Sequence, residues 1–164
     1  IMVAASPKGI CMIEFGKSRA SLKHTLQQRF SRAVLEAADG ELDNWLQRII
    51  DYLRLPEGSL DLPLDVQGTA FQQQVWQLLQ TIPAGETMSY AGIAGRMGRP
   101  EAVRAVAGAI AANKLAVAIP CHRVIGSDGK LHGYRWGMER KEALLGKERK
   151  ANRRKGAQRA QRWR

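Results

Sequence analysis

The sequence is poor in cysteine, in aromatic side chains and in long hydrophobic runs. Its 164 residues include two cysteines, too few for the disulfide framework of a small secreted scaffold. No apolar stretch approaches the roughly 20 residues of a membrane-spanning helix, and the first few residues lack the basic and apolar regions of a signal peptide. We therefore expect reduced thiols at Cys11 and Cys121, a cytoplasmic location and no membrane partner. Since the chain opens at Ile1 rather than Met, we also expect either a piece of a longer protein or a trimmed chain.

Positive charge is abundant but unevenly placed. The formal net charge is +11, and residues 149–164 hold eight of the 26 basic residues and no acidic one, which leaves +3 on the rest of the chain. A basic protein of this size suggests a nucleic-acid partner, although a solvated basic tail explains the same charge equally well. Because residues 151–164 have no apolar pattern, we expect this basic tail to be disordered.

Residues 1–68 combine strand and helix patterns and are expected to form a first, α/β unit. Apolar residues flank the turn Pro7-Lys8-Gly9, which predicts a hairpin within residues 1–15. Apolar residues at helical spacing predict helices over 20–30 and 41–54. The prolines and glycines of residues 55–68 exclude a continuous helix and indicate a linker with one extended piece.

A second, mainly α-helical unit is expected over residues 69–150. A Thr-x-x-Gln capping box begins a helix that should end near Pro83. Two short helices follow over 89–97 and 100–112, joined by a glycine-containing turn, which is the helix-turn-helix pattern. A last helix is expected from 138 to 150. Helix pairs of this kind occur in many all-α domains, so the pattern alone is a moderate signal.

The helix expected over 100–112 has an unusual surface. One side carries the apolar residues of a core stripe, whereas the other is formed by alanine and glycine, with Arg104 as its long cation. Small side chains let another helix pack closely against this side. They equally let the helix enter a DNA groove with Arg104 protruding. The residues alone leave both interpretations open.

Cys121 and His122 follow the apolar run 115–119, which we expect to be a buried extended segment. A cysteine close to a base can become a thiolate nucleophile, and a carboxylate would then orient the imidazole. Spacing does not select that carboxylate among three glutamates of the last expected helix: Glu139, Glu142 and Glu148. A lone Cys-His pair is more often structural than catalytic, so the residues by themselves leave that alternative open.

A metal site is not expected. Adjacent side chains such as Cys121 and His122 chelate a metal poorly, and the other cysteine and histidine residues are scattered at Cys11, His24 and His132. Cys11 alternates with apolar neighbours in a predicted strand and is best explained as a core residue. We therefore predict neither a metal nor a cofactor.

The motif Pro120-Cys121-His122-Arg123-Val124 resembles the active-site motif of the O6-alkylguanine-DNA alkyltransferases. Further motifs follow the family's order and spacing: Ser89-Tyr90, Arg104-Ala105-Val106, Asn113, Gly133-Tyr134 and Lys141-Glu142-x-Leu144-Leu145-x-x-Glu148. The resemblance covers residues 69–148 strongly and 1–68 more weakly, where it implies a ribonuclease-H-like α/β domain. Two motifs are most similar to the C-terminal half of the bacterial adaptive-response (Ada) branch: Phe71-Gln72-Gln73-x-Val75-Trp76 and Gly133-Tyr134-Arg135-Trp136-Gly137.

This resemblance implies DNA repair by a single-use transfer of the methyl group of O6-methylguanine to Cys121. No turnover follows, because a thioether is not hydrolysed. The resemblance implies that His122 takes the thiol proton, in the family through a water, and that Glu148 holds His122. It implies that Tyr90 donates to the guanine as charge develops on the leaving oxygen, and that Asn113 tethers the active-site turn.

The resemblance also implies how the base and the DNA are bound. The carbonyls of Cys121 and Val124 would read the exocyclic amine, and the backbone N–H of Arg135 would meet O6, beside Tyr134 and Trp136. Arg104 corresponds to the family's finger, which fills the gap left by the flipped base. The residues expected to line the minor-groove contact are Met97, Pro100, Val103, Ala105 and Gly108.

Trp136 stands where other family members carry a small residue. We expect its indole to crowd the pocket mouth, which leaves methyl transfer unaffected and puts benzyl-sized groups in doubt.

The expected partner is double-stranded DNA containing O6-alkylguanine, bound by a monomer. Two alternatives are a non-catalytic sensor of alkylated DNA and a transcription regulator that uses the same helix-turn-helix. Sensors of this kind replace the cysteine, whereas this chain keeps Cys121.

Overall fold

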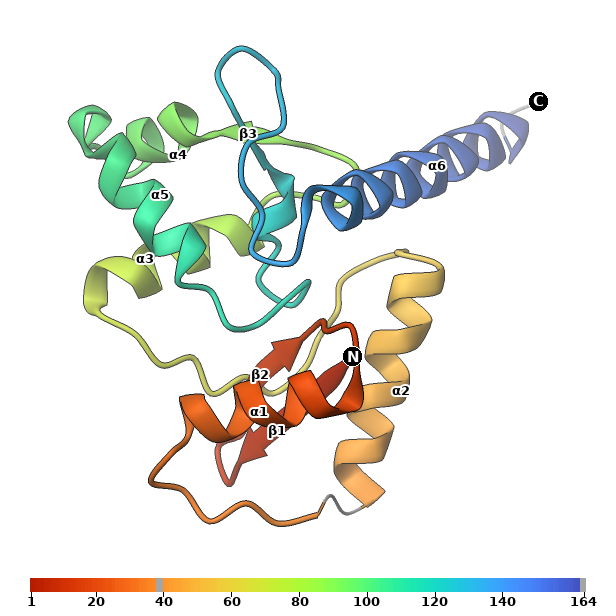
Figure 1. Ribbon diagram of the computed structural model, residues 1–164. Helices are drawn as coiled ribbons and strands as arrows, with labels where there is room; N and C mark the ends of the chain where they lie inside the picture. Colours follow the sequence, from red (N-terminus) through yellow and green to blue (C-terminus); the bar gives the residue numbers. More distant parts are fainter. Residues whose placement is uncertain (38–39, 163–164) are drawn as a thin grey trace.

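The computed structural model describes residues 1–37 and 40–162, with residues 157–162 described by their backbone alone. It is a mixed α/β structure in which helices predominate (Figure 1). A hairpin and two helices from residues 1–54 lie below a group of helices from residue 70 onward (Figure 1). The last helix projects away from both groups.

The first unit is a hairpin with two helices, as the sequence predicts. Its elements are β1 (Met2–Ser6), β2 (Gly9–Glu14), α1 (Arg19–Arg29) and α2 (Gly40–Arg54). The two strands pair antiparallel. Gly9 at the turn has a backbone φ of +139°, which residues other than glycine rarely adopt. A reciprocal capping box between Ser18 and Ser21 begins α1.

The linker over residues 55–68 contains the extended piece that its composition suggests. The Ile10 N–H donates to the Pro63 carbonyl and the Asp65 N–H donates to the Ile10 carbonyl, both at 2.8 Å. Leu64 thereby forms a parallel bridge with Ile10 of β2. The linker is thus tied to the edge of the hairpin before the second unit begins.

The second unit consists of helices and one pair of very short strands. Its elements are α3 (Ala70–Gln80), β3 (Met88–Ser89), α4 (Tyr90–Arg96), the 3-10 turn η1 (Pro100–Ala102), α5 (Val103–Ala111), the 3-10 turn η2 (Cys121–Arg123), β4 (Val124–Ile125) and α6 (Met138–Arg162). The expected caps are present, because the side chains of Thr69 and Ser89 accept the N–H groups of Gln72 and Gly92.

One hydrophobic core joins the two units. It includes Ile10 and Ile13 of β2, Ile49 of α2, and residues from α3, α4, α5 and the segment 115–121. Ile13 also bridges Leu115 through backbone hydrogen bonds. The hairpin therefore supports the segment that leads to Cys121.

Residues 115–119 are buried as expected, but they are not extended. The Ile119 N–H donates to the Leu115 carbonyl at 3.0 Å, which closes a compact turn, and Val117 has a φ of +59°. A β-branched residue rarely adopts this left-handed conformation. The expectation of an extended segment is wrong because local hydrogen bonds, which the apolar pattern does not reveal, bend the chain here.

Helix α6 is longer than the sequence pattern predicts. It continues through Arg162, twelve residues beyond the expected end at Lys150. The prediction of a disordered tail is therefore wrong over 151–162, and residues 163–164 lie outside the described residues. Alanine, arginine, lysine and glutamine predominate in this stretch and favour helix even without an apolar stripe, and Ala151 is buried against the body.

Cys11 differs from the expectation of a core residue. It is half-buried while its neighbours in β2 are buried, and its thiol lies 3.5 Å from the Ala4 carbonyl. Burial and the negative charge of Asp65 raise the pKa of the Cys11 thiol, which keeps it protonated.

Within the described residues, no helix is long and apolar enough to cross a membrane.

Candidate active site

Cys121 lies at the start of the turn η2, directly after Pro120. The side chain of Cys121 is 4% exposed. The Cys121 N–H donates to the Ile119 carbonyl at 2.8 Å, and the Arg123 N–H donates to the Pro120 carbonyl at 3.0 Å. These two bonds fix a bent backbone on either side of the sulfur, so the thiol occupies a defined position inside the molecule.

Asn113, just after α5, contacts both the backbone of this turn and the sulfur of Cys121. Its amide nitrogen lies 2.9 Å from the Ile119 carbonyl and 3.2 Å from Cys121 Sγ, and its Oδ1 accepts the Leu115 N–H at 2.8 Å. Asn113 is 1% exposed. Because these bonds are made in a dry environment, they hold the turn more firmly than exposed bonds would.

His122 is paired with Glu148 of α6. Nε2 of His122 lies 2.8 Å from Glu148 Oε1, and both side chains are buried. The other two glutamates of the same helix, Glu139 and Glu142, are exposed. The fold thus selects Glu148 among the three. Since a carboxylate only accepts, Nε2 carries the proton and Nδ1 of His122 keeps a free lone pair.

Arg123 is a second buried partner of Glu148 and was not singled out by the sequence reasoning. Its Nη2 donates to Glu148 Oε1 at 2.8 Å and to the Tyr52 hydroxyl at 2.9 Å. The Gly85 N–H donates to Glu148 Oε2 at 3.0 Å. Arg123 stands inside the quoted motif, but Tyr52 lies 71 residues away, so only the fold reveals this contact.

These contacts keep Glu148 ionised. Burial by itself raises the pKa of a carboxyl group, but the hydrogen bonds from His122 and Arg123 bring the pKa of Glu148 down to about 2. Burial lowers the pKa of His122 from its ordinary value, against the opposing effect of Glu148. At neutral pH the pair is therefore a carboxylate and a neutral imidazole that can accept a proton.

The thiol itself is protonated in the resting protein. Burial raises the pKa of Cys121 to about 11, while the Asn113 hydrogen bond and the charges of Lys141 and Arg135 act in the opposite direction. Lys141 is fully buried, and its ammonium donates to the His132 carbonyl at 2.7 Å. The site therefore combines a shielded neutral thiol with groups that favour its anion.

Two tyrosines adjoin the thiol. Tyr90, at the start of α4, is half-buried, and its pKa is raised by burial and, when the Cys121 thiol is ionised, by the thiolate charge. The ring of Tyr134 lies edge-on to His122, with centroids 6.5 Å apart. Burial raises the pKa of Tyr134 as well. Both hydroxyls thus stay protonated and can donate, and among the described residues the Tyr134 hydroxyl has no hydrogen-bond partner.

The sequence predicts Trp136 at the mouth of a pocket, but the structure has it in the core. The indole is 4% exposed, and its N–H donates to Glu14 Oε1 of β2 at 2.6 Å. Its ring contacts Phe15 and Tyr134 in edge-to-face geometry. A buried indole N–H needs an acceptor, and the first unit supplies one. The neighbouring Arg135 is exposed, and Val124 is buried in β4, where it pairs with Met88.

The small-residue side of α5 faces solvent. Its exposed members are Arg104, Ala105 and Gly108, while Val103 and Met97 are half-buried and Pro100 is exposed. No neighbouring atom lies within 4 Å of the position that a side chain on Gly108 would take. On the opposite side, the Trp76 indole donates to the Ala109 carbonyl at 2.8 Å and holds the helix to the core. Tight packing on another helix therefore does not explain this surface.

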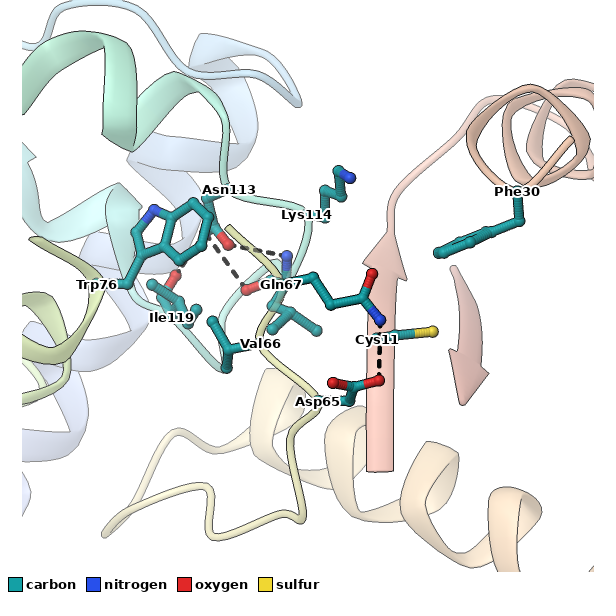
Figure 2. Close-up of a pocket in the computed structure, with 10 residues that line it drawn as sticks. Cys11, Phe30, Asp65, Val66, Gln67, Trp76, Asn113, Lys114 and Ile119 are labelled. Atoms are coloured by element: carbon teal, nitrogen blue, oxygen red, sulfur yellow. Dashed lines mark hydrogen bonds between the residues drawn. The ribbon is translucent and has the colours of Figure 1, made fainter. Parts of the chain in front are cut away.

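A small cavity lies between the two units, apart from the thiol of Cys121. Figure 2 shows Asn113 on one side of it and Cys11 on the other, with the Cys11 sulfur directed away from Asn113. The cavity measures about 10 Å³, roughly the space of one water molecule. It is far too small for a nucleobase, so it is not a substrate site.

The described residues contain no group of three or more histidine, cysteine, aspartate or glutamate side chains placed to hold a metal ion. His132 pairs with Asp128 at 3.2 Å on an exposed loop.

Residues 70–150 match the family model described as "6-O-methylguanine DNA methyltransferase, DNA binding domain". The chain is 53% identical over 147 residues to the "Bifunctional transcriptional activator/DNA repair enzyme Ada" of Escherichia coli, covering 90% of this chain but 42% of that protein. It is 38% identical over 151 residues to the inducible methylated-DNA–protein-cysteine methyltransferase of Bacillus subtilis, covering 92% of this chain and 84% of that protein. The chain thus spans less than half the length of the first of these relatives and most of the second.

Solved structures give the same relationship. The Mycobacterium tuberculosis O6-methylguanine methyltransferase superposes with a TM-score of 0.70 at 35% identity, covering 91% of this chain and 92% of that one. The Mycobacterium tuberculosis OGT in complex with DNA gives a TM-score of 0.62 at 47% identity over 65% of each chain. The similarity extends over both units of the fold.

Proposed function

The chain belongs to the O6-methylguanine-DNA methyltransferases, the methylated-DNA–protein-cysteine methyltransferase family, and on this basis we propose that it repairs O6-alkylguanine in duplex DNA by moving the alkyl group to Cys121. The observation that carries the proposal is the buried constellation around that sulfur. Asn113 contacts Sγ directly, and the adjacent His122 is held by an ionised Glu148. A structural cysteine would need neither.

The thiol is activated only when its proton has somewhere to go. His122 is neutral and keeps a free lone pair at Nδ1, so it accepts the thiol proton, through a water molecule where the two do not touch. Glu148 stabilises the imidazolium that forms, and Lys141 and the Asn113 amide stabilise the thiolate. A resting pKa of about 11 protects the nucleophile until the site is used.

The transfer step is an in-line displacement. The Cys121 thiolate forms a bond to the methyl carbon while the bond from that carbon to guanine O6 breaks, and its electron pair stays on the guanine. The Tyr90 hydroxyl donates to the guanine as negative charge develops. The carbonyls of Cys121 and Val124 and the N–H of Arg135 hold the base edges, beside Tyr134, and Trp136 supports Tyr134 from the core side.

DNA binding belongs to the α4–α5 pair used as a helix-turn-helix. The target base must leave the stack to reach a buried sulfur. Arg104 projects from the small-residue side of α5 and fills the gap that the flipped base leaves in the duplex. The minor-groove contact is lined by Met97, Pro100, Val103, Ala105 and Gly108. The first unit, which the family likeness describes as ribonuclease-H-like, supports the site from behind through Glu14. We propose that the protein acts as a monomer in the bacterial cytosol.

Mass spectrometry tests the proposal. The protein is incubated with duplex DNA that contains one O6-methylguanine, then digested and analysed peptide by peptide. We expect one methylene equivalent on Cys121 and none on Cys11, and no transfer in Cys121→Ser, whose hydroxyl is a far weaker nucleophile. Cys11→Ser is the matched control and should react normally. Methyl transfer that persists in Cys121→Ser would overturn the assignment. Duplex binding without any transfer in the parent protein would favour a sensor.

A further inference from the structure

The C-terminal part of α6 carries a strong positive charge that the proposed repair chemistry does not use. The family model ends at residue 150, whereas α6 continues to Arg162. At 1.5 Å per residue, the extension over 151–162 adds roughly 18 Å of helix. In Figure 1 this part of α6 projects beyond the rest of the molecule.

Helix geometry divides this part of α6 into two sides. Four cations fall within about 140° of one another around the axis, and we name them the basic face: Arg149, Lys150, Arg153 and Arg154. The opposite side contains Glu148 and Ala151, which are buried, the exposed Lys155, and Asn152, whose amide donates to the Ala84 carbonyl at 2.9 Å. One side of α6 thus holds the body of the protein and the basic face points away from it.

The basic face is exposed and has no internal counter-charge. All four side chains are exposed, and no salt bridge within the described part of the chain involves any of them. Its members also stand in like-charge pairs four residues apart, Arg149 with Arg153 and Lys150 with Arg154, an arrangement that destabilises a helix. A polyanion bound along this side would remove that repulsion.

We propose that the basic face binds the phosphate backbone of the same DNA duplex, outside the segment held by α4 and α5. This proposal rests on the proposed repair function for the identity of the polyanion. Successive turns of the face present cations about 6 Å apart along the axis, close to two base-pair steps. Lysine and arginine on an exposed helix neutralise phosphates without reading sequence. The basic face therefore raises affinity for any duplex and keeps the protein on DNA between damaged sites.

The test compares two variants with equal loss of charge. One carries Arg149→Gln, Lys150→Gln, Arg153→Gln and Arg154→Gln, since glutamine keeps helix propensity. The matched control carries glutamine at four exposed cations of the first unit: Lys8, Lys17, Arg19 and Lys23. Binding to undamaged duplexes of about 10 bp and about 30 bp, one and three helical turns, is measured over a range of salt concentrations.

On the long duplex we expect the α6 variant to lose at least about tenfold in affinity, and its log–log salt slope to fall by roughly 3 to 4, since each phosphate contact contributes about 0.9. The short duplex, filled by α4 and α5, should show little change, and the control variant should bind both as the parent does. An unchanged slope, or an equal loss in the control variant, overturns the proposal. A loss confined to an RNA hairpin of the same length assigns the face to RNA and also overturns it.

A failure of the basic-face proposal can be distinguished from a failure of the proposed repair function. Methyl transfer from free O6-methylguanine to Cys121 should be the same in both variants and the parent, because the free base needs no phosphate contact. If the parent fails to transfer methyl at all, the repair function falls. The salt dependence on undamaged duplex still decides the role of the basic face.

Discussion

The indole N–H of Trp136 donates to the Glu14 carboxylate at 2.6 Å across 122 positions of the sequence. The other oxygen of Glu14 lies 2.6 Å from Arg29 of α1, so one buried carboxylate joins the hairpin, α1 and the loop before α6. Trp136 in turn contacts Tyr134, which lies edge-on to His122. The first unit thereby sets the position of the loop that borders His122.

We expect Glu14→Leu to destabilise the protein by about 3 kcal/mol, because two donors then lose their acceptor. These donors are the half-buried guanidinium of Arg29 and the buried indole N–H of Trp136. Chemical denaturation measures this change. A double-mutant cycle between Glu14→Leu and Trp136→Phe should give a coupling energy of about 1 to 2 kcal/mol. Glu57→Leu, at an exposed glutamate, is the control and should change stability little. Strict additivity in the cycle would mean that the bond does not support the loop.

The Glu148 network predicts how stability depends on pH. The pKa of Glu148 is about 2 in the folded protein, below its ordinary value of 4.5. A depressed carboxyl pKa adds stability above the unfolded value, and this stability is lost as pH falls from about 4.5 toward about 2. The lowered pKa of His122 acts in the same direction, beginning below its ordinary value of 6.5. Urea denaturation at a series of pH values follows both.

Glu148→Gln should remove the contribution of Glu148 to the acid-side loss between pH 4.5 and about 2, and it should lower stability at neutral pH, because Arg123 then lacks a buried counter-charge. Glu142→Gln, at an exposed glutamate of the same helix, serves as the control and should leave the pH profile unchanged. A parallel acid-side loss in parent and Glu148→Gln would show that other carboxyl groups govern acid unfolding.

Asn113 should tune the reactivity of the thiol. Its hydrogen bond lowers the pKa of Cys121 against the larger effect of burial. Asn113→Asp keeps an acceptor for the Leu115 N–H but replaces the donor with a negative charge beside the sulfur, so we expect the thiol pKa to rise above about 11 and methyl transfer to slow. The rate of alkylation by iodoacetamide against pH, in a Cys11→Ser background, reports the thiol pKa. A profile that is unchanged or shifted to lower pH would contradict this role.

Arg104→Ala should slow repair in duplex DNA much more than reaction with free O6-methylguanine. Base flipping costs a few kcal/mol, and the free base requires none. The measurement is the ratio of single-turnover rates on the two substrates in variant and parent. Arg19→Ala, at an exposed cation of α1, is the control and should keep the parent ratio. An equal loss on both substrates would mean that Arg104 supports the pocket or the fold rather than flipping.

Local features were determined by the sequence itself. The hairpin around Pro7, the capped helix starts after Thr69 and Ser89, and the candidate nucleophile Cys121 all depend on residues within a few positions of one another. Such patterns fix backbone preferences directly, because caps and turns satisfy hydrogen bonds inside one short segment. The resemblance of the motif around Cys121 added the chemistry.

Only the tertiary structure showed that Glu148 contacts His122 directly, that Arg123 and Tyr52 belong to the same network, and that Trp136 lies in the core. Each of these contacts joins elements far apart in the chain, so its existence depends on how the two units pack. Residues 115–119 show the same limit. Their apolar pattern predicts burial correctly, but the turn is set by Asn113 and by backbone bonds that no periodicity encodes. Burial follows from composition, whereas direction and partnership follow from packing.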